Sequence, residues 1–186
     1  MDYALEKGVN FIDAAELYPV PANAETYGDT ERIIGNWLKK TGNRDKVVLA
    51  SKIAGGGDYT AHIRKNGFSK KGITEAIENS LKRLQTDYMD LYQLHWPSRG
   101  VNCFGVRDYP YKTASKEAEN HLEILETLSD FIKQGKIKHI GLSNETPWGT
   151  MKYLQASEQY NLPKPVTIQN SYSLIHRGYE VGMSEV

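Results

Sequence analysis

The sequence predicts an α/β fold, an incomplete (β/α)8 TIM barrel, as a single domain over residues 1–186. Strand-like apolar segments alternate with amphipathic helices at intervals of roughly 30–45 residues, the pattern of a parallel sheet with right-handed crossovers. The strand-like segments end in polar residues, as expected where both faces of a sheet are covered. A doubly wound open sheet would carry a glycine-rich phosphate turn directly after its first strand. This chain has no such turn there, and the glycines at 55–57 lead into a polar loop instead of a helix.

The expected elements follow in a regular order. Ala4, Leu5 and Gly8 fit the last turn of a helix that stops at a glycine. Strands are expected at 9–15, 47–53, 89–96, 137–144 and 166–174. Helices are expected at about 28–40, from Ser69 to about residue 84, at 121–134, and from Pro147 onward. Five strands are fewer than a complete barrel requires, so at least three are absent.

Local signals set the helix ends. Asp29 or Thr30 is the expected cap of the helix at 28–40, and Ser69 is the expected cap of the next one. Gly135 is placed to stop the helix at 121–134. Pro147 suits the first position of the last helix, because its missing N–H has no partner there anyway.

Composition excludes several classes of protein. Lys and Arg total 23 and Asp and Glu total 23, so the net charge is zero, which argues against a nucleic-acid partner. Hydrophobic residues make up 39% of the chain, enough for a packed core. No apolar run approaches the roughly 18 residues of a membrane span, and the first residues lack the apolar segment of a signal peptide. We therefore expect a cytoplasmic protein without membrane insertion.

Cysteine and histidine give no sign of a metal site. The single cysteine, Cys103, excludes an intramolecular disulfide and a multi-cysteine zinc site, and we assign it no role. The five histidines are scattered, without the helical i, i+4 spacing of metal ligands. We expect no metal.

Polar residues stand where the predicted strands end. They are Asp13, Lys52, His95, Ser143 with Asn144, and Gln169 with Asn170. Each one alone also fits a structural role: Asp13 as the cap of a turn, Lys52 as a side chain that extends out of the core, and Ser143 with Asn144 as a helix cap. In a barrel, however, the carboxyl ends of the strands surround the active site.

Taken together, these side chains suggest a reaction. Tyr18 follows the first strand in the same loop as Asp13. An ammonium beside a phenol lowers the phenol pKa from about 10, and a carboxylate keeps the ammonium charged. We therefore expect Lys52 to lower the pKa of Tyr18. A phenol that exchanges its proton near neutral pH suits carbonyl reduction, in which hydride reaches carbon and a proton reaches oxygen.

Six segments carry a family resemblance that covers nearly the whole chain in order. They are GVNFIDAAELY (8–18), YGDTERIIGNWL (27–38), VLASK (48–52), DYMDLYQLHWP (87–97), GKIKHIGLSNET (135–146) and IQNSYSL (168–174). With these segments the chain resembles the aldo-keto reductases, NAD(P)H-dependent oxidoreductases with a (β/α)8 barrel. It is more distantly similar to the β subunits of voltage-gated potassium channels.

The resemblance implies a role for each residue of the site. Tyr18 would be the general acid for reduction and the base for oxidation, Lys52 would lower its pKa, and Asp13 would support Lys52. His95 would orient the carbonyl of a small-molecule substrate. The nicotinamide carboxamide would be held by Ser143, Asn144 and Gln169. Trp96 would form a wall of the substrate pocket, and the loops 54–68 and 97–116 would shape specificity.

The resemblance also implies that parts of the barrel are absent. The five strands would be strands two to six, without strand one and strands seven and eight, whose loops hold the cofactor pyrophosphate and 2′-phosphate. Strands two and six would then be open edges. We expect an internal fragment that, as a stand-alone polypeptide, binds NADPH weakly or not at all and is poorly soluble. The cofactor is expected to be NADP(H) on resemblance alone, and NAD(H) stays open, as do the carbonyl substrate and the oligomeric state.

Two other functions remain to be weighed. A non-catalytic regulatory or partner-binding subunit, similar to the potassium channel β subunits, would keep the same barrel. A hydrolase is disfavoured, because the chain lacks a Gly-x-Ser-x-Gly nucleophile turn.

Overall fold

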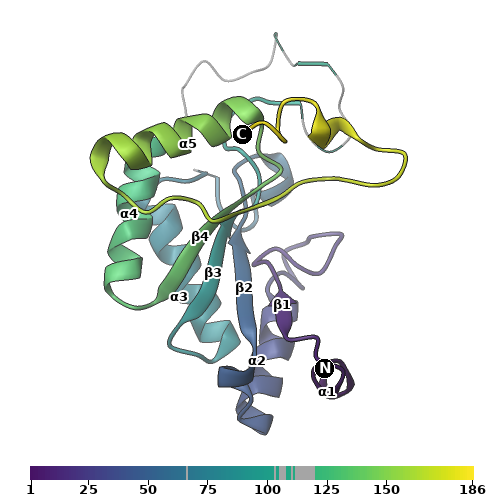
Figure 1. Ribbon diagram of the computed structural model, residues 1–186. Helices are drawn as coiled ribbons and strands as arrows, with labels where there is room; N and C mark the ends of the chain where they lie inside the picture. The colour runs from purple at the N-terminus through teal and green to yellow at the C-terminus, as the bar shows by residue number, and fades with distance from the viewer. Residues whose placement is uncertain (66, 103, 105–107, 110, 112–119) are drawn as a thin grey trace.

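The computed structural model describes residues 1–65, 67–102, 104, 108, 109, 111 and 120–186. Its strands form one parallel sheet in the order β1-β2-β3-β4-β5 (Figure 1). The strands are β1 (Phe11–Asp13), β2 (Val48–Ile53), β3 (Met89–Leu94), β4 (Ile137–Ser143) and β5 (Thr167–Gln169). The strand order follows the chain without a reversal. This order is that of a (β/α)8 barrel, since a doubly wound sheet reverses its order at a switch point.

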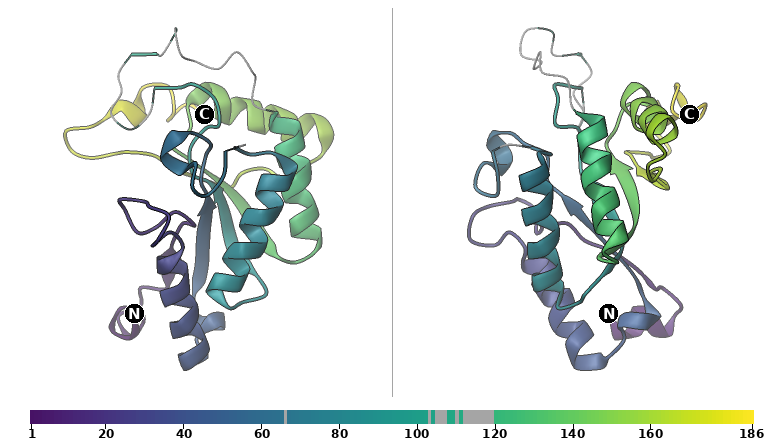
Figure 2. Two further views of the ribbon diagram at one scale, coloured as in Figure 1. Left: turned by 180° about the vertical axis from the view of Figure 1, so that it is seen from behind. Right: turned by 90° about the vertical axis from the view of Figure 1, so that its left-hand side faces the viewer.

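The helices cover the outer side of the curled sheet. They are α1 (Asp2–Glu6), α2 (Asp29–Thr41), α3 (Lys70–Leu84), α4 (His121–Lys133) and α5 (Pro147–Tyr160). In Figure 1 helices α2, α3 and α4 lie behind the sheet, and the left view of Figure 2 shows them in front of it. The described residues place no helix on the inner face of the sheet. The chain therefore forms part of a (β/α)8 barrel, as predicted.

The hydrophobic core lies between the sheet and these helices. Its largest fully buried side chains come from β2, β3, α3, α4 and α5, and include Leu49, Ile53, Ile73, Ile77, Leu84, Met89, Tyr92, Ile124, Leu125, Leu128 and Tyr153. The central strands β2 and β3 are buried along almost their whole length. The edge strands β1 and β5 have only three residues each, fewer than the sequence suggests, because each has a hydrogen-bonded neighbour on one side only.

The predicted N-terminal caps are confirmed for α3 but not for α2. The Ser69 side chain accepts a hydrogen bond from the Gly72 N–H at 3.1 Å, as predicted. The prediction for α2 is wrong: its N-cap is Gly28, in the left-handed region at φ 81°. Asp29 lies inside the helix and binds Arg32 instead. A Cβ at Gly28 would come within 2.6 Å of the Arg83 side chain, so space as well as backbone conformation favours glycine here.

Two further ends bear on the site. Pro147 begins α5 as predicted, but the cap is Thr146, whose hydroxyl accepts a hydrogen bond from the Gly149 N–H at 3.1 Å. The capping alternative for Ser143 and Asn144 is therefore wrong, and both side chains are available for other contacts. Gly135, at φ 71°, follows α4 as predicted. Among the described residues, no helix combines the length and the apolar character that a membrane crossing needs.

Candidate active site

The carboxyl ends of all five strands meet at one edge of the sheet. The register pairs Asp13 with Ala50, Leu94 with Leu142, and Ser143 with Gln169. Because the strands are parallel and in register, side chains from the last residue of each strand and from the loops that follow lie close together.

Lys52 is the centre of this edge. Its side chain is fully buried, and its Nζ donates to Asp13 Oδ2 at 2.6 Å and to the Ala14 carbonyl at 2.9 Å. A charged amine is buried only where such partners replace water. Burial lowers the pKa of Lys52, and the hydrogen bond and charge of Asp13 oppose that change.

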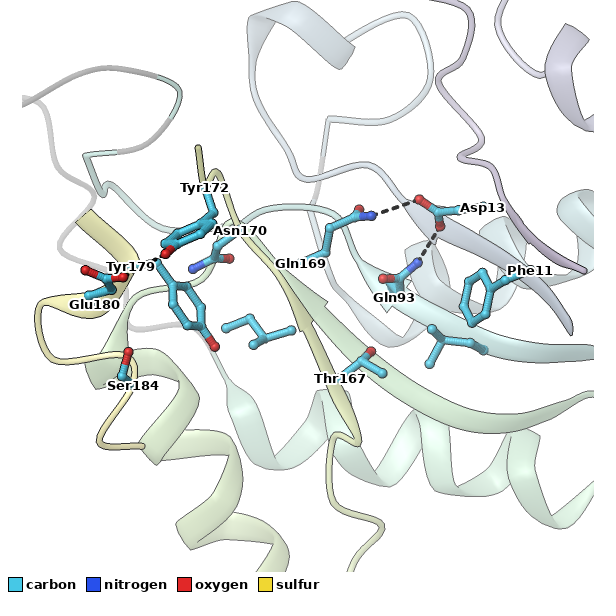
Figure 3. A pocket seen from close by; sticks show the side chains of 12 residues that line it. Phe11, Asp13, Gln93, Thr167, Gln169, Asn170, Tyr172, Tyr179, Glu180 and Ser184 are labelled. Atoms are coloured by element: carbon cyan, nitrogen blue, oxygen red, sulfur yellow. Dashed lines mark hydrogen bonds between the residues drawn. The ribbon is translucent and has the colours of Figure 1, made fainter. Parts of the chain in front are cut away.

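Asp13 collects donors from three strands (Figure 3). Besides Lys52 of β2, its Oδ1 accepts from Gln93 Nε2 at 2.8 Å and its Oδ2 accepts from Gln169 Nε2 at 3.0 Å. Gln93 was not predicted from the sequence. Its signal is a buried polar residue in strand β3, at the position that pairs with Lys52. The carboxylate is therefore held in place by amides as well as by the ammonium.

Tyr18 and His95 complete the group. The Tyr18 ring centroid lies 5.3 Å from Lys52 Nζ, and the Tyr18 and His95 rings meet edge to face at 5.6 Å and 81°. The Tyr18 backbone is fixed as well, since its carbonyl accepts from the Gly28 N–H at 3.1 Å. The structure thus brings together Asp13, Tyr18, Lys52 and His95, which come from separate parts of the chain.

The electrostatics of Tyr18 differ from the prediction. Burial raises the pKa of Tyr18, and the negative charge of Asp13 raises it further. The expected net lowering by Lys52 does not occur, because burial and the charge of Asp13, which lies 2.6 Å from Lys52 Nζ, outweigh the ammonium. In this structure Tyr18 is a protonated phenol at neutral pH, the form that a proton donor requires.

His95 is neutral in the folded chain. It is 7% exposed, and burial, followed by the charge of Lys52, lowers the pKa of His95 to about 3. Its Nδ1 is buried and has no hydrogen-bond partner among the described residues. Because an orphaned buried N–H is costly, the proton of the neutral ring belongs on Nε2. His95 can then donate a hydrogen bond from Nε2.

This burial predicts a pH dependence of stability. The pKa of His95 is about 3 in the folded chain and about 6.5 unfolded, so between these values the unfolded chain binds the extra proton. The stabilisation is complete above about pH 6.5 and is lost as the pH falls toward 3, with a slope of up to about 1.4 kcal/mol per pH unit. Urea denaturation at several pH values would show a shallower slope for His95→Asn. Equal slopes for both proteins would contradict the prediction.

Hydrogen bonds join the ends of β3, β4 and β5 through Ser143, Asn144 and Gln169. The Ser143 hydroxyl and the Asn144 N–H both donate to the Gln169 carbonyl, at 3.0 and 2.9 Å. Asn144 Nδ2 donates to the His95 carbonyl at 2.9 Å and to Ser143 Oγ at 3.1 Å. These residues therefore lie together beside His95, as the sequence suggests.

An open cavity of about 620 Å³ lies along the inner face of the sheet (Figure 3). Asp13, Gln93, Gln169 and Asn170 line one part of it. The rest is lined by other side chains of β1, β3 and β5 and by the segment after β5, which contributes Tyr172, Tyr179, Glu180 and Ser184. Of the four candidate catalytic residues, only Asp13 lines this cavity.

Trp96 lies beside His95. The two ring centroids are 4.9 Å apart, and Trp96 also meets the ring of Phe104 at 5.7 Å. Any side chain at Gly55 would collide with the indole of Trp96. Trp96 thus lies directly beside His95, which is compatible with the expected pocket wall. The loop 97–116 and Cys103 lie partly or wholly outside the described residues, as does residue 66 of the loop 54–68.

Within the described part of the chain, no three His, Cys, Asp or Glu side chains are grouped as metal ligands.

Comparison with known proteins gives a consistent result. The model of the aldo/keto reductase family matches residues 1–186. Protein tas of Escherichia coli is 50% identical over the whole of this chain, which covers 54% of that protein. The oxidoreductase YrpG of Bacillus subtilis is 36% identical, with 97% of this chain and 50% of that protein covered. The chain spans about half the length of these relatives.

A solved structure agrees with the fold. The thermostable aldo-keto reductase Tm1743, crystallised with the inhibitor epalrestat, matches with a TM-score of 0.69 and 27% identity. The match covers 97% of this chain and 51% of that chain. The five strands described above thus correspond to about half of a solved structure of this kind.

Proposed function

Because this chain belongs to the aldo/keto reductase family, we propose that it carries the catalytic group of an oxidoreductase that transfers hydride between NAD(P)H and an aldehyde or ketone. The observation that carries the proposal is the buried Lys52 ammonium, paired with Asp13 at 2.6 Å and facing the ring of Tyr18. Tyr18 and the neutral His95 are in edge-to-face contact, so two groups that can donate a proton lie side by side.

The residues of the β4 and β5 ends fit a nicotinamide carboxamide. A carboxamide needs both donors and acceptors, and the Gln169 amide, exposed at the cavity, offers both. Ser143 and Asn144 are the other residues that would hold it, and NADP(H) is the proposed cofactor, on family resemblance. The cofactor, when bound, supplies or accepts the hydride.

The remaining work falls to the chain's own groups. His95 orients the substrate carbonyl by donating from Nε2, and Tyr18 gives its phenolic proton to the carbonyl oxygen during reduction. The Lys52 ammonium, 5.3 Å from the Tyr18 ring centroid, limits the cost of the phenolate left behind, although burial and Asp13 keep the net pKa of Tyr18 raised. Asp13 keeps Lys52 charged in a buried position. Trp96, packed beside His95, bounds the space for the substrate.

One observation favours a second candidate. The raised pKa of Tyr18 makes it a weaker acid than the sequence predicts. A non-catalytic regulatory or partner-binding subunit with the same residues would not require an acidified phenol.

Deuteride transfer separates the two functions. The full chain is incubated with an aldehyde and NADPH carrying deuterium on the reactive nicotinamide carbon, at millimolar cofactor concentration because the sequence predicts weak binding. Reductase activity places one deuterium on the alcohol carbon of the product. Cofactor binding without deuterated alcohol over a panel of aldehydes and ketones would favour the non-catalytic function.

A further inference from the structure

Asn144 adopts a left-handed backbone conformation at the edge of the site. Its φ is 52°, in a region that asparagine enters more readily than most residues other than glycine, though less readily than extended or right-handed backbone. Contacts with the surroundings therefore select this conformation. Hydrogen bonds to Gln169 and His95 fix Asn144 itself, as described above. The next residue, Glu145, is fixed from both sides.

Asn170 holds the backbone of Glu145. Its Nδ2 donates to the Glu145 carbonyl at 2.8 Å, and its Oδ1 accepts from the Glu145 N–H at 3.2 Å. The side chain thus satisfies both main-chain polar groups of a residue that lies beyond the paired part of β4 and β5. The Asn170 side chain thus extends the pairing of β4 with β5 by one residue beyond the pair Ser143 and Gln169.

A buried ion pair holds the side chain of Glu145. The Glu145 carboxylate, 4% exposed, is bound by the Arg99 guanidinium through both oxygens, with Arg99 Nη1 at 3.0 Å from Oε2. A Cβ at Gly149 would collide with both groups, so the first turn of α5 is shaped around the pair. The loop after β3 is thereby tied to the loop after β4.

We propose that Asn170 is a positioning residue: by pairing with Glu145 it keeps Asn144 left-handed, with its amide on the His95 carbonyl. The Arg99–Glu145 pair is the second anchor of the same turn. The consequence for cofactor binding rests on the proposed function, but the backbone effect does not. Asn170 itself need not touch the cofactor.

Amide hydrogen exchange measured by NMR tests the backbone effect on the full chain without cofactor. In Asn170→Ala the Glu145 amide loses its acceptor, and its exchange is expected to accelerate about tenfold or more, together with that of Asn144. Amides of β2 and β3 should keep their rates. Asn170→Asp retains the acceptor for the Glu145 N–H and should accelerate exchange less than Asn170→Ala does. If the alanine variant does not fold, the exchange rates of Asn170→Asp test the role of Asn170 instead. Ser171→Ala, an exposed neighbour, is the matched control.

The outcomes separate the explanations. Unchanged exchange at Asn144 and Glu145, or an equal increase throughout the sheet, would overturn the proposal. In a second measurement, fluorescence titration with NADPH should give an approximately tenfold weaker dissociation constant for Asn170→Ala and none of that change for Ser171→Ala. If the unmodified chain binds no NADPH, cofactor binding by this part of the barrel alone is ruled out, whereas the exchange rates still decide the role of Asn170.

Discussion

Replacing Tyr18 with phenylalanine is expected to lower aldehyde-dependent turnover by about 10²–10⁴-fold, the usual effect of removing a general acid. The phenyl ring keeps the edge-to-face contact with His95, so the variant removes the proton and little else. The raised pKa of Tyr18 means that the unmodified residue holds this proton at neutral pH. The measurement is the turnover number at saturating aldehyde and cofactor.

A matched variant makes the result specific. Tyr160→Phe removes a hydroxyl from a half-exposed tyrosine at the end of α5, away from the strand ends that carry the site, and should leave turnover unchanged. Cofactor binding should be equal in both variants, because neither hydroxyl is assigned to the nicotinamide. A Tyr18→Phe protein that retains most of its turnover would show that another group, or water, donates the proton.

Strand periodicity alone predicts that certain polar side chains lie at one edge of the sheet. Asp13 and Lys52 lie near the carboxyl ends of β1 and β2 and His95 follows β3, and parallel strands necessarily bring such residues to one edge. Gln93 was missed because its partner Asp13 is 80 positions away in the chain. Asp13 of β1 and Gln93 of β3 come together only because both strands pair with β2, which lies between them. Periodicity does not reveal partners of this kind.

The wrong prediction for the pKa of Tyr18 has a different cause. Residue types alone indicate a lysine near a phenol and favour a lowered pKa. The direction depends on the distance between Lys52 and Asp13 and on the burial of the ring, which are properties of the folded chain. The N-cap of α2 was predicted wrongly for a similar reason. Gly28 has no capping side chain, and it is favoured by its left-handed backbone and by the Arg83 side chain, which is distant in sequence and occupies the space where a Cβ would lie.

The second large effect is expected at a buried ion pair that supports both Tyr18 and Lys52. Glu16 is 1% exposed, and its carboxylate binds the Arg64 guanidinium through both oxygens, with Nη2 at 2.8 Å from Oε2. It also accepts from the Ala54 N–H at 2.6 Å, and the Glu16 N–H donates to the Lys52 carbonyl at 3.1 Å. The pair therefore joins the Tyr18 loop to the end of β2.

Arg64→Ala should destabilise the fold by about 3–5 kcal/mol, because it leaves the Glu16 carboxylate buried without a counter-charge. The free energy of unfolding in urea gives this value. Arg32→Ala is the control: it breaks the exposed pair with Asp29 and should cost no more than about 1 kcal/mol. The double variant Arg64→Ala with Glu16→Gln removes the unpaired charge while keeping an acceptor for Ala54, so it should recover part of the loss. If the double variant is less stable than Arg64→Ala, the cost comes from lost packing and not from a stranded charge.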